Sequence, residues 1–183
     1  MKGMIFTSLG DLVEEEFGIA AWNRALARID SVVDGAYVDA DTYPSSEMLS
    51  LVGALVEELQ TPADALLDLF GQKLFIDLYR LYPELVDRHT ELVPFLASVG
   101  SDIHEEMKIL HVDAEVPDMS CDFYDRTRLI MYYDSPRKMC LLAEGLIRGA
   151  AQHFNTRIEL LHSECMHRGD PRCKFELKVL QTH

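Results

Sequence analysis

No stretch of the chain approaches the roughly 18–20 consecutive apolar residues that a membrane-spanning helix needs. Basic residues are also scarce, because 17 Lys and Arg stand against 31 Asp and Glu, which gives a formal net charge of -14. This charge repels phosphate backbones, so we expect no nucleic-acid partner, and we expect no membrane association either. The N-terminal segment MKGMIFTSLG has a single lysine and leads into the acidic DLVEEEFG. That is not the pattern of a signal peptide, so a cytoplasmic protein is expected.

Cysteine is rare, with four residues in 183, and a cytoplasmic location predicts reduced thiols or metal ligands rather than disulfides. The sequence contains no internal repeat and no low-complexity tract. Hydrophobic residues make up 48% of the chain, which indicates a globular protein with one compact domain or two closely packed lobes.

Helical periodicity dominates the sequence up to Pro117. Apolar residues recur at helical spacing over several segments: 9–18, 19–29, 45–60, 63–82, and the pair 90–100 and 101–111, separated at Gly100. After Pro117, short segments rich in aromatic and branched residues predict a hairpin over 119–133. A long helix over 135–154 and a second hairpin over 156–180 complete the pattern. This order predicts an α+β fold, with an N-terminal helical lobe packed on a C-terminal lobe that has a small antiparallel sheet and one long helix.

The predicted long helix and second hairpin carry a group of possible metal ligands: Cys140, His162, Cys165 and Cys173. Three thiolates and one imidazole are the ligand set of a closed tetrahedral zinc site, and soft thiolates select zinc over magnesium or calcium. The alternative is that they are small buried hydrophobic residues and a surface histidine. His167 is a rival to His162, whereas Cys121 is more simply explained as a packed strand residue.

A Tyr-x-Ser-x-Arg motif, Tyr133, Ser135 and Arg137, lies where a predicted strand leads into the long helix. A helix N-terminus has unpaired N–H groups and a partial positive charge, and an arginine fork matches a carboxylate or a phosphate. The motif therefore predicts a small anion clamp. A capped helix with a surface arginine explains the same residues, with Ser135 as the cap and Pro136 in the first turn.

Three stretches together point to one family: MKGMIF at the start, SDIHEEMKILH before a proline, and YDSPR ahead of the long helix. Over essentially its full length, the chain resembles the stand-alone bacterial H-NOX proteins, which are heme nitric oxide/oxygen binding domains. The resemblance implies heme b as the cofactor, His104 as the axial ligand of its iron, and Pro117 as a residue that presses on the porphyrin. It assigns Tyr133, Ser135 and Arg137 to the heme propionates.

The resemblance also bears on two alternatives. From the residues alone, His111 on the same predicted helix is as good an iron ligand as His104, and only the family position favours His104. The four possible zinc ligands match a site found in a subset of the bacterial members, so zinc is expected as a second cofactor.

The resemblance further implies a distal pocket whose side chains cannot donate a hydrogen bond: Ile5, Leu9, Leu74, Leu78, Leu142 and Leu146. Family members that hold oxygen stably have a tyrosine at the position of Leu142. Tyr79 and Tyr82 belong to the same predicted helix as Leu78, but packing with a surface hydroxyl explains them more simply. An apolar pocket offers no acid or base for peroxide chemistry, so we expect a sensor that binds NO and CO, and not an enzyme.

The expectation is a single H-NOX domain over 1–183, in which 1–62 is a helical subdomain and 63–183 carries heme and zinc. NO binding is expected to break the bond between iron and His104 and to shift the two lobes. A partner histidine kinase or diguanylate cyclase then responds. The alternative is a zinc/thiol redox sensor that uses the group of three cysteines and one histidine, with heme secondary.

Overall fold

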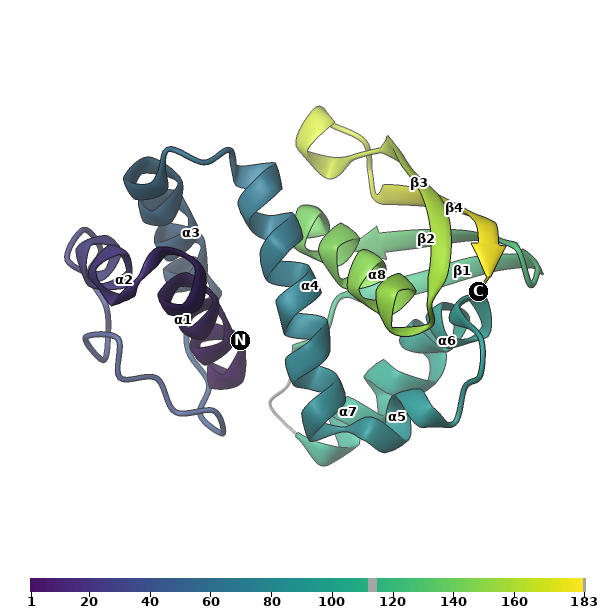
Figure 1. Cartoon of the computed structure of the whole chain (residues 1–183), viewed down its shortest axis with the longest axis horizontal. Helices are drawn as coiled ribbons and strands as arrows, with labels where there is room; N and C mark the ends of the chain where they lie inside the picture. The colour runs from purple at the N-terminus through teal and green to yellow at the C-terminus, as the bar shows by residue number, and fades with distance from the viewer. Residues whose placement is uncertain (112–114, 183) are drawn as a thin grey trace.

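The computed structural model describes residues 1–111 and 115–182, and one long helix runs between its two lobes (Figure 1). The N-terminal lobe is formed by α1 Gly3–Phe17, α2 Ile19–Leu26 and α3 Ser45–Leu59. On α1 the apolar residues repeat at helical spacing, and Phe6, Leu9 and Val13 are completely buried. Gly18 has a φ of 84°, which lets the chain turn directly from α1 into α2.

The long helix is α4 Ala63–Leu81, and it crosses α8 Cys140–His153 at very short range. A Cβ atom on Gly71 would lie 2.5 Å from the carbonyl oxygen of Leu142, and one on Gly145 would lie 2.5 Å from the carbonyl oxygen of Asp68. Both positions are glycine, so the two helices meet backbone to backbone. This crossing fixes the position of α4 against the C-terminal lobe.

After α4 the chain continues through α5 Pro83–Asp87 and α6 Leu92–Ser98 into a π-helical turn, Val99–Ile103, and then α7 His104–Leu110. The two predicted helices on either side of Gly100 are α6 and α7, and a π-helical turn that contains Gly100 joins them instead of an irregular break. A Cβ atom on Gly100 would lie 2.1 Å from the carbonyl oxygen of Met119. The glycine therefore allows a close approach to a strand, and it does not end a helix. Such π-turns occur frequently at functional sites.

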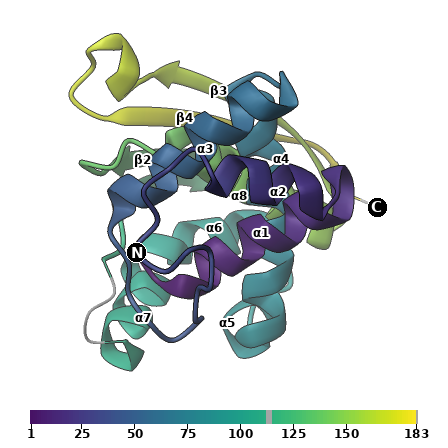
Figure 2. The same ribbon diagram turned by 90° about the vertical axis from the view of Figure 1, so that its left-hand side faces the viewer.

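The remaining elements form a four-stranded antiparallel sheet in the order β1-β2-β4-β3: β1 Asp118–Asp125, β2 Arg128–Asp134, β3 Thr156–Glu164 and β4 Cys173–Thr182. Alternate residues of β2, including Leu129 and Met131, are buried and share a core cluster with Ile147 of α8. Figure 2 views the molecule from the side of the N-terminal lobe and shows β3 and β4 at one end of it. The predicted α+β fold, with both hairpins, is confirmed.

The predicted start of the long helix is wrong. Helix α8 begins at Cys140 and not at Ser135, because Lys138 has a φ of 50°, which helical backbone does not adopt. The segment before it is a turn in which the backbone N–H of Lys138 donates to the carbonyl oxygen of Ser135 at 3.0 Å. Ser135 is therefore not a helix cap, and Arg137 belongs to a strand-to-helix turn.

Buried side chains form two clusters. One lies among α1, α2, α3 and the first half of α4, and it includes Phe6, Leu55 and Phe70. The other lies between the sheet, α6 and α8, and it includes Phe95 and Phe175. In the part of the chain that the structure describes, no helix is long and apolar enough to cross a membrane.

Candidate cofactor pocket and metal centre

An apolar cavity of about 300 Å³ is lined mainly by the C-terminal lobe, with Met1 and Lys2 of the N-terminal segment, and α4 and α8 form one of its walls. The opposite wall comes from α5, α6, the π-turn and α7, through residues that include Leu85, Leu96, Val99 and Met107. The volume falls at the lower end of the range of about 300–1,000 Å³ that is usual for cofactor pockets. The wall residues from α5 and α6 were not predicted as site residues, because buried leucine and valine at helical spacing are equally typical of an ordinary core.

His104 is the first residue of α7, directly after the π-turn, and it lines the cavity together with Pro117. Its Nδ1 atom is buried and has no hydrogen-bond partner among residues 1–111 and 115–182. Burial lowers the pKa of His104, so the imidazole is neutral near pH 7, which is the form that binds metals. The ring also has a backbone hydrogen bond with Pro117, whereas the buried Nδ1 without a partner is costly and marks His104 as a residue suited to bind a group in the cavity.

Tyr133 and Arg137 also line the cavity. Ser135, which lies between them in the sequence, is buried. The Tyr133 hydroxyl accepts the backbone N–H of Met139 at 3.1 Å, and burial raises the pKa of this tyrosine. The Arg137 guanidinium donates to the carbonyl oxygen of Glu115 at 2.8 Å. A guanidinium has five N–H donors, so this contact leaves donors for a carboxylate at the cavity.

The expected distal residues fall into two groups. Leu78, Leu142 and Leu146 line the cavity. Ile5, Leu9 and Leu74 lie in the neighbouring core among the N-terminal helices and α4. All of these side chains are apolar.

Tyr79 of α4 and Tyr82, which follows α4, also line the cavity, and their hydroxyl groups are engaged elsewhere. The Tyr79 hydroxyl donates to Asp87 at 3.1 Å, and the Tyr82 hydroxyl lies 2.8 Å from Nε2 of His111. These contacts agree with the interpretation that both rings pack against the cavity wall while their hydroxyls point to polar partners.

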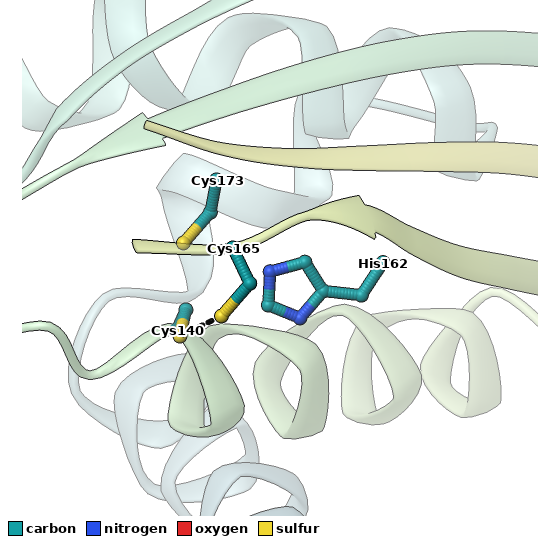
Figure 3. Close-up of side chains that lie close together, drawn as sticks. All are labelled: Cys140, His162, Cys165 and Cys173. Carbon is teal, nitrogen blue, oxygen red and sulfur yellow. Dashed lines mark hydrogen bonds between the residues drawn. The ribbon is translucent and has the colours of Figure 1, made fainter. Parts of the chain in front are cut away.

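A second possible site lies at the N-terminal end of α8, where the four predicted zinc ligands converge (Figure 3). The ligand atoms of Cys140, His162, Cys165 and Cys173 all lie within 4.8 Å of one another, and the sulfur atoms of Cys140 and Cys165 are 3.8 Å apart. Two thiolates bound at about 2.3 Å to one tetrahedral zinc ion are also about 3.8 Å apart. The set therefore fits a zinc ion in both chemistry and spacing.

The electrostatics of this group also favour a cation. Burial, followed by the neighbouring sulfur of Cys173, raises the pKa of Cys140. Burial likewise raises the pKa of Cys173. Without a metal, the thiols are therefore held in the protonated form, and a bound cation would stabilise the thiolates.

His162 has a partner that the sequence analysis did not identify. The Nδ1 atom of His162 lies 2.7 Å from Oε1 of Glu144. Glu144 is one helical turn after Cys140 on α8. The Nε2 atom of His162 is buried and has no partner among the described residues. The helical spacing of Cys140 and Glu144 was the available signal, but in so acidic a chain one more glutamate does not stand out.

The other candidates lie elsewhere. Nε2 of His167 is 2.7 Å from the carbonyl oxygen of Lys138, so His167 is outside the cluster. Cys121 is partly buried on β1, with its sulfur 3.5 Å from the carbonyl oxygen of Ala97. Burial raises the pKa of this thiol.

The fold and these two sites define a small α+β domain with an internal cofactor pocket and an adjacent candidate metal centre. The model of the Haem-NO-binding family matches residues 2–162, and the chain belongs to this H-NOX family of heme-based gas sensors. A comparison with curated proteins gives no significant match.

Solved structures of two bacterial H-NOX proteins are similar along the whole chain. The unliganded Fe(II) protein from K. algicida is 30% identical, with a TM-score of 0.93 over 100% of this chain and 98% of that one. The S. oneidensis protein in its Fe(II)NO state is 32% identical, with a TM-score of 0.90 over 99% of this chain and 100% of that one. The S. oneidensis protein has also been solved in an Fe(II)CO state.

Proposed function

We propose that this protein is a nitric oxide sensor that binds heme b in the apolar cavity through His104. The observation that carries the proposal is the buried Nδ1 atom of His104, which has no partner in the described structure and belongs to a residue that lines the cavity. The Fe(II)NO state of the S. oneidensis relative supports NO as the ligand. The Fe(II)CO state of the same relative supports CO as a second ligand.

Heme, when bound, supplies an iron atom at which a diatomic gas can coordinate. The residues of the chain have separate roles around it. His104 would hold the iron from α7, Arg137 would pair with the propionates with the help of Tyr133 and Ser135, and Pro117 would contact the ring. Leu78, Leu142 and Leu146 keep the gas side apolar and exclude water, and Ile5, Leu9 and Leu74 form the packing behind them.

Signalling is proposed to depend on how firmly α7 is held. Apart from His104, the described side-chain polar contacts that join α7 and its C-cap His111 to other elements are an ion pair of 2.6 Å between Glu106 and Arg88, and the 2.8 Å contact of His111 with Tyr82. Release of His104 from the iron would remove one attachment of α7 and leave these polar contacts together with apolar packing such as that of Met107. Segment 1–62 then shifts against 63–183, and a histidine kinase or a diguanylate cyclase detects the changed surface.

The test is the absorption spectrum of the reduced protein with and without NO. The expected result is a strong Soret band that shifts to shorter wavelength with NO, as His104 leaves the iron and the complex becomes five-coordinate. A colourless protein that takes up no added hemin would contradict the proposal.

We further propose zinc as a structural cofactor at Cys140, His162, Cys165 and Cys173, as in a subset of the bacterial family. The sulfurs are poorly placed for the alternative role as a thiol redox sensor, because Cys140 and Cys173 are 0% exposed and reactive thiols need access. Elemental analysis of the protein purified under reducing conditions tests this, with Cys173→Ser as the comparison. One zinc per chain is expected in the wild type, and a metal-free wild type would rule the site out.

A further inference from the structure

Glu144 lies on a helix of the cavity wall, and its carboxylate contacts one of the proposed metal ligands, His162. Glu144 belongs to α8, and its side chain is only 14% exposed. Each of its two oxygens has a different partner on a different element or turn. A glutamate that only solubilises a helix surface would not be enclosed in this way.

The first oxygen determines which nitrogen of His162 is available to a metal. Oε1 lies 2.7 Å from Nδ1, so the Nδ1–H donates to the carboxylate and Nε2 keeps its lone pair. Nε2 is buried and has no partner within the described residues. Figure 3 shows the His162 ring beside the sulfur atoms. A carboxylate on the outer nitrogen is the usual device that orients a histidine ligand and raises its basicity.

The second carboxylate oxygen of Glu144 contacts a residue outside the metal centre. Oε2 of Glu144 accepts a hydrogen bond from Nη2 of Arg148 at 3.2 Å, one turn further along α8. Nη1 of Arg148 donates to Oδ1 of Asp68 on α4 at 2.5 Å. The contacts therefore run from His162 through Glu144 and Arg148 to Asp68 without a break.

Asp68 lies where movement of α4 would affect the cavity. Its carbonyl oxygen would be 2.5 Å from a Cβ atom on Gly145, so it belongs to the backbone contact between α4 and α8. The same contact includes the backbone of Leu142 and Leu146, whose side chains line the cavity. Polar contacts thus connect the metal centre to the helices that form the wall of the cofactor pocket.

We propose that Glu144 is a positioning residue that presents Nε2 of His162 to the metal and, through Arg148 and Asp68, couples the metal centre to the cofactor pocket. This inference rests on the proposed zinc site. By reciprocity, heme bound in the cavity changes the affinity of the zinc site, and zinc changes the affinity for heme by the same factor.

The positioning role is tested by zinc affinity, measured in competition with a chromophoric chelator on reduced protein. Glu144→Ala should weaken zinc binding by about 10–100-fold, which is the usual cost of losing such a partner. Glu144→Gln should weaken it less, because the amide oxygen can still accept from Nδ1. Glu159→Gln is the matched control, since Glu159 is an exposed carboxylate on β3, and it should leave the affinity unchanged.

A second readout separates positioning from a loss of folding. Cobalt(II) bound to the same group gives visible absorption that depends on ligand geometry, and Glu144→Gln should alter this spectrum while circular dichroism remains that of the wild type. Unchanged zinc affinity and an unchanged cobalt spectrum in Glu144→Ala would overturn the positioning role. A wild type that binds no zinc would instead overturn the metal site itself.

The coupling is tested by comparing zinc affinity with and without heme. In the wild type the two affinities should differ, and in Arg148→Met the difference should disappear while zinc still binds. Asp68→Asn should act like Arg148→Met, because it removes the charge at the other end of the same ion pair. Equal affinities with and without heme in the wild type would overturn the coupling.

Discussion

His104 begins α7 and His111 follows its last residue in an extended conformation, and their surroundings distinguish them. Nε2 of His111 is 2.8 Å from the hydroxyl of Tyr82, whereas Nδ1 of His104 has no partner among the described residues. His104→Gly should therefore remove the bond between protein and iron, and added imidazole should restore a five-coordinate ferrous spectrum. The measurement is the absorption and resonance Raman spectrum of the reduced protein.

His111→Gly is the matched control, and it should keep the wild-type ferrous spectrum. If His104→Gly kept that spectrum and His111→Gly lost it, the ligand assignment would be reversed.

Leu142 determines, on our proposal, which gas remains bound. Bound oxygen carries partial negative charge on its outer atom, and a hydrogen-bond donor stabilises it by about 0.5–1.5 kcal/mol, or more in a dry pocket. The apolar residues Leu78, Leu142 and Leu146 offer no donor. The ferrous wild type should therefore bind NO and CO but form no stable oxygen complex in air.

Leu142→Tyr should create or prolong a ferrous oxygen complex, measured by its absorption spectrum and lifetime in air-equilibrated buffer. Leu142→Phe supplies a ring without the hydroxyl and is the control. A long-lived oxygen complex in the wild type would show that a donor reaches the gas from elsewhere.

The sequence was enough to identify the proposed metal ligands, because their residue types are rare. It was not enough to identify the residues that position those ligands. The four proposed zinc ligands are rare residue types, and the structure brings all four together. Glu144 is one of 31 acidic residues, and only the contact with Nδ1 of His162 distinguishes it. Ile5, Leu9 and Leu74 were named from family positions alone, and the structure places them in the core among the N-terminal helices and α4.

At the scale of elements, helix and strand types were predictable, whereas their ends were not. Strong periodicity identified α1, α3 and α4, and turn residues identified both hairpins. The start of α8 was missed because Lys138 adopts a φ of 50°, which no residue preference signals. The π-turn before His104 was missed because it depends on the contact between Gly100 and β1.

The crossing of α4 and α8 should be sensitive to a single methyl group. In Gly71→Ala the new Cβ would lie 2.5 Å from the carbonyl oxygen of Leu142 and 2.6 Å from the Cα of Gly145, and these are backbone atoms that cannot rotate away. Overpacking of this kind costs about 1–3 kcal/mol, so the free energy of unfolding should fall by that amount. Urea denaturation monitored by circular dichroism provides the measurement.

Gly53→Ala is the matched control for this crossing. Gly53 lies inside α3 with nothing within 4 Å of a new Cβ, and alanine should stabilise the helix by about 0.5–1 kcal/mol. Equal effects of the two substitutions would show that α4 and α8 are not in rigid backbone contact.

At the scale of the whole molecule, the net charge of -14 constrains the partner surface. On our proposal, a histidine kinase or a cyclase that docks on an acidic face of this protein presents a basic face to it, and rising salt should then weaken the complex through slower association. The charge was readable from the sequence alone. The arrangement of two cores joined across α4 required the structure, because Leu66 to Leu74 belong to one cluster and Phe75 belongs to the other.

The proposed shift of 1–62 against 63–183 can be followed by the fluorescence of a tryptophan in the chain. Trp22 is the single tryptophan of the chain, and it is buried in the N-terminal lobe against Gly10. Heme in the C-terminal lobe would quench its fluorescence by energy transfer, to an extent that depends on their distance and orientation. NO should therefore change the Trp22 emission lifetime, once the different absorption of each heme complex is taken into account.

CO is the control ligand, because it is expected to leave His104 on the iron and should leave the corrected transfer efficiency at the unliganded value. His104→Gly removes the bond that NO is proposed to break, so NO and CO should then give the same efficiency. Equal efficiencies for NO and CO in the wild type would mean that the lobes do not move when His104 is released. The signal would then have to leave the molecule through α7 and its C-cap His111, for which the contacts with Arg88 and Tyr82 are the only side-chain polar links described to the segment around α5.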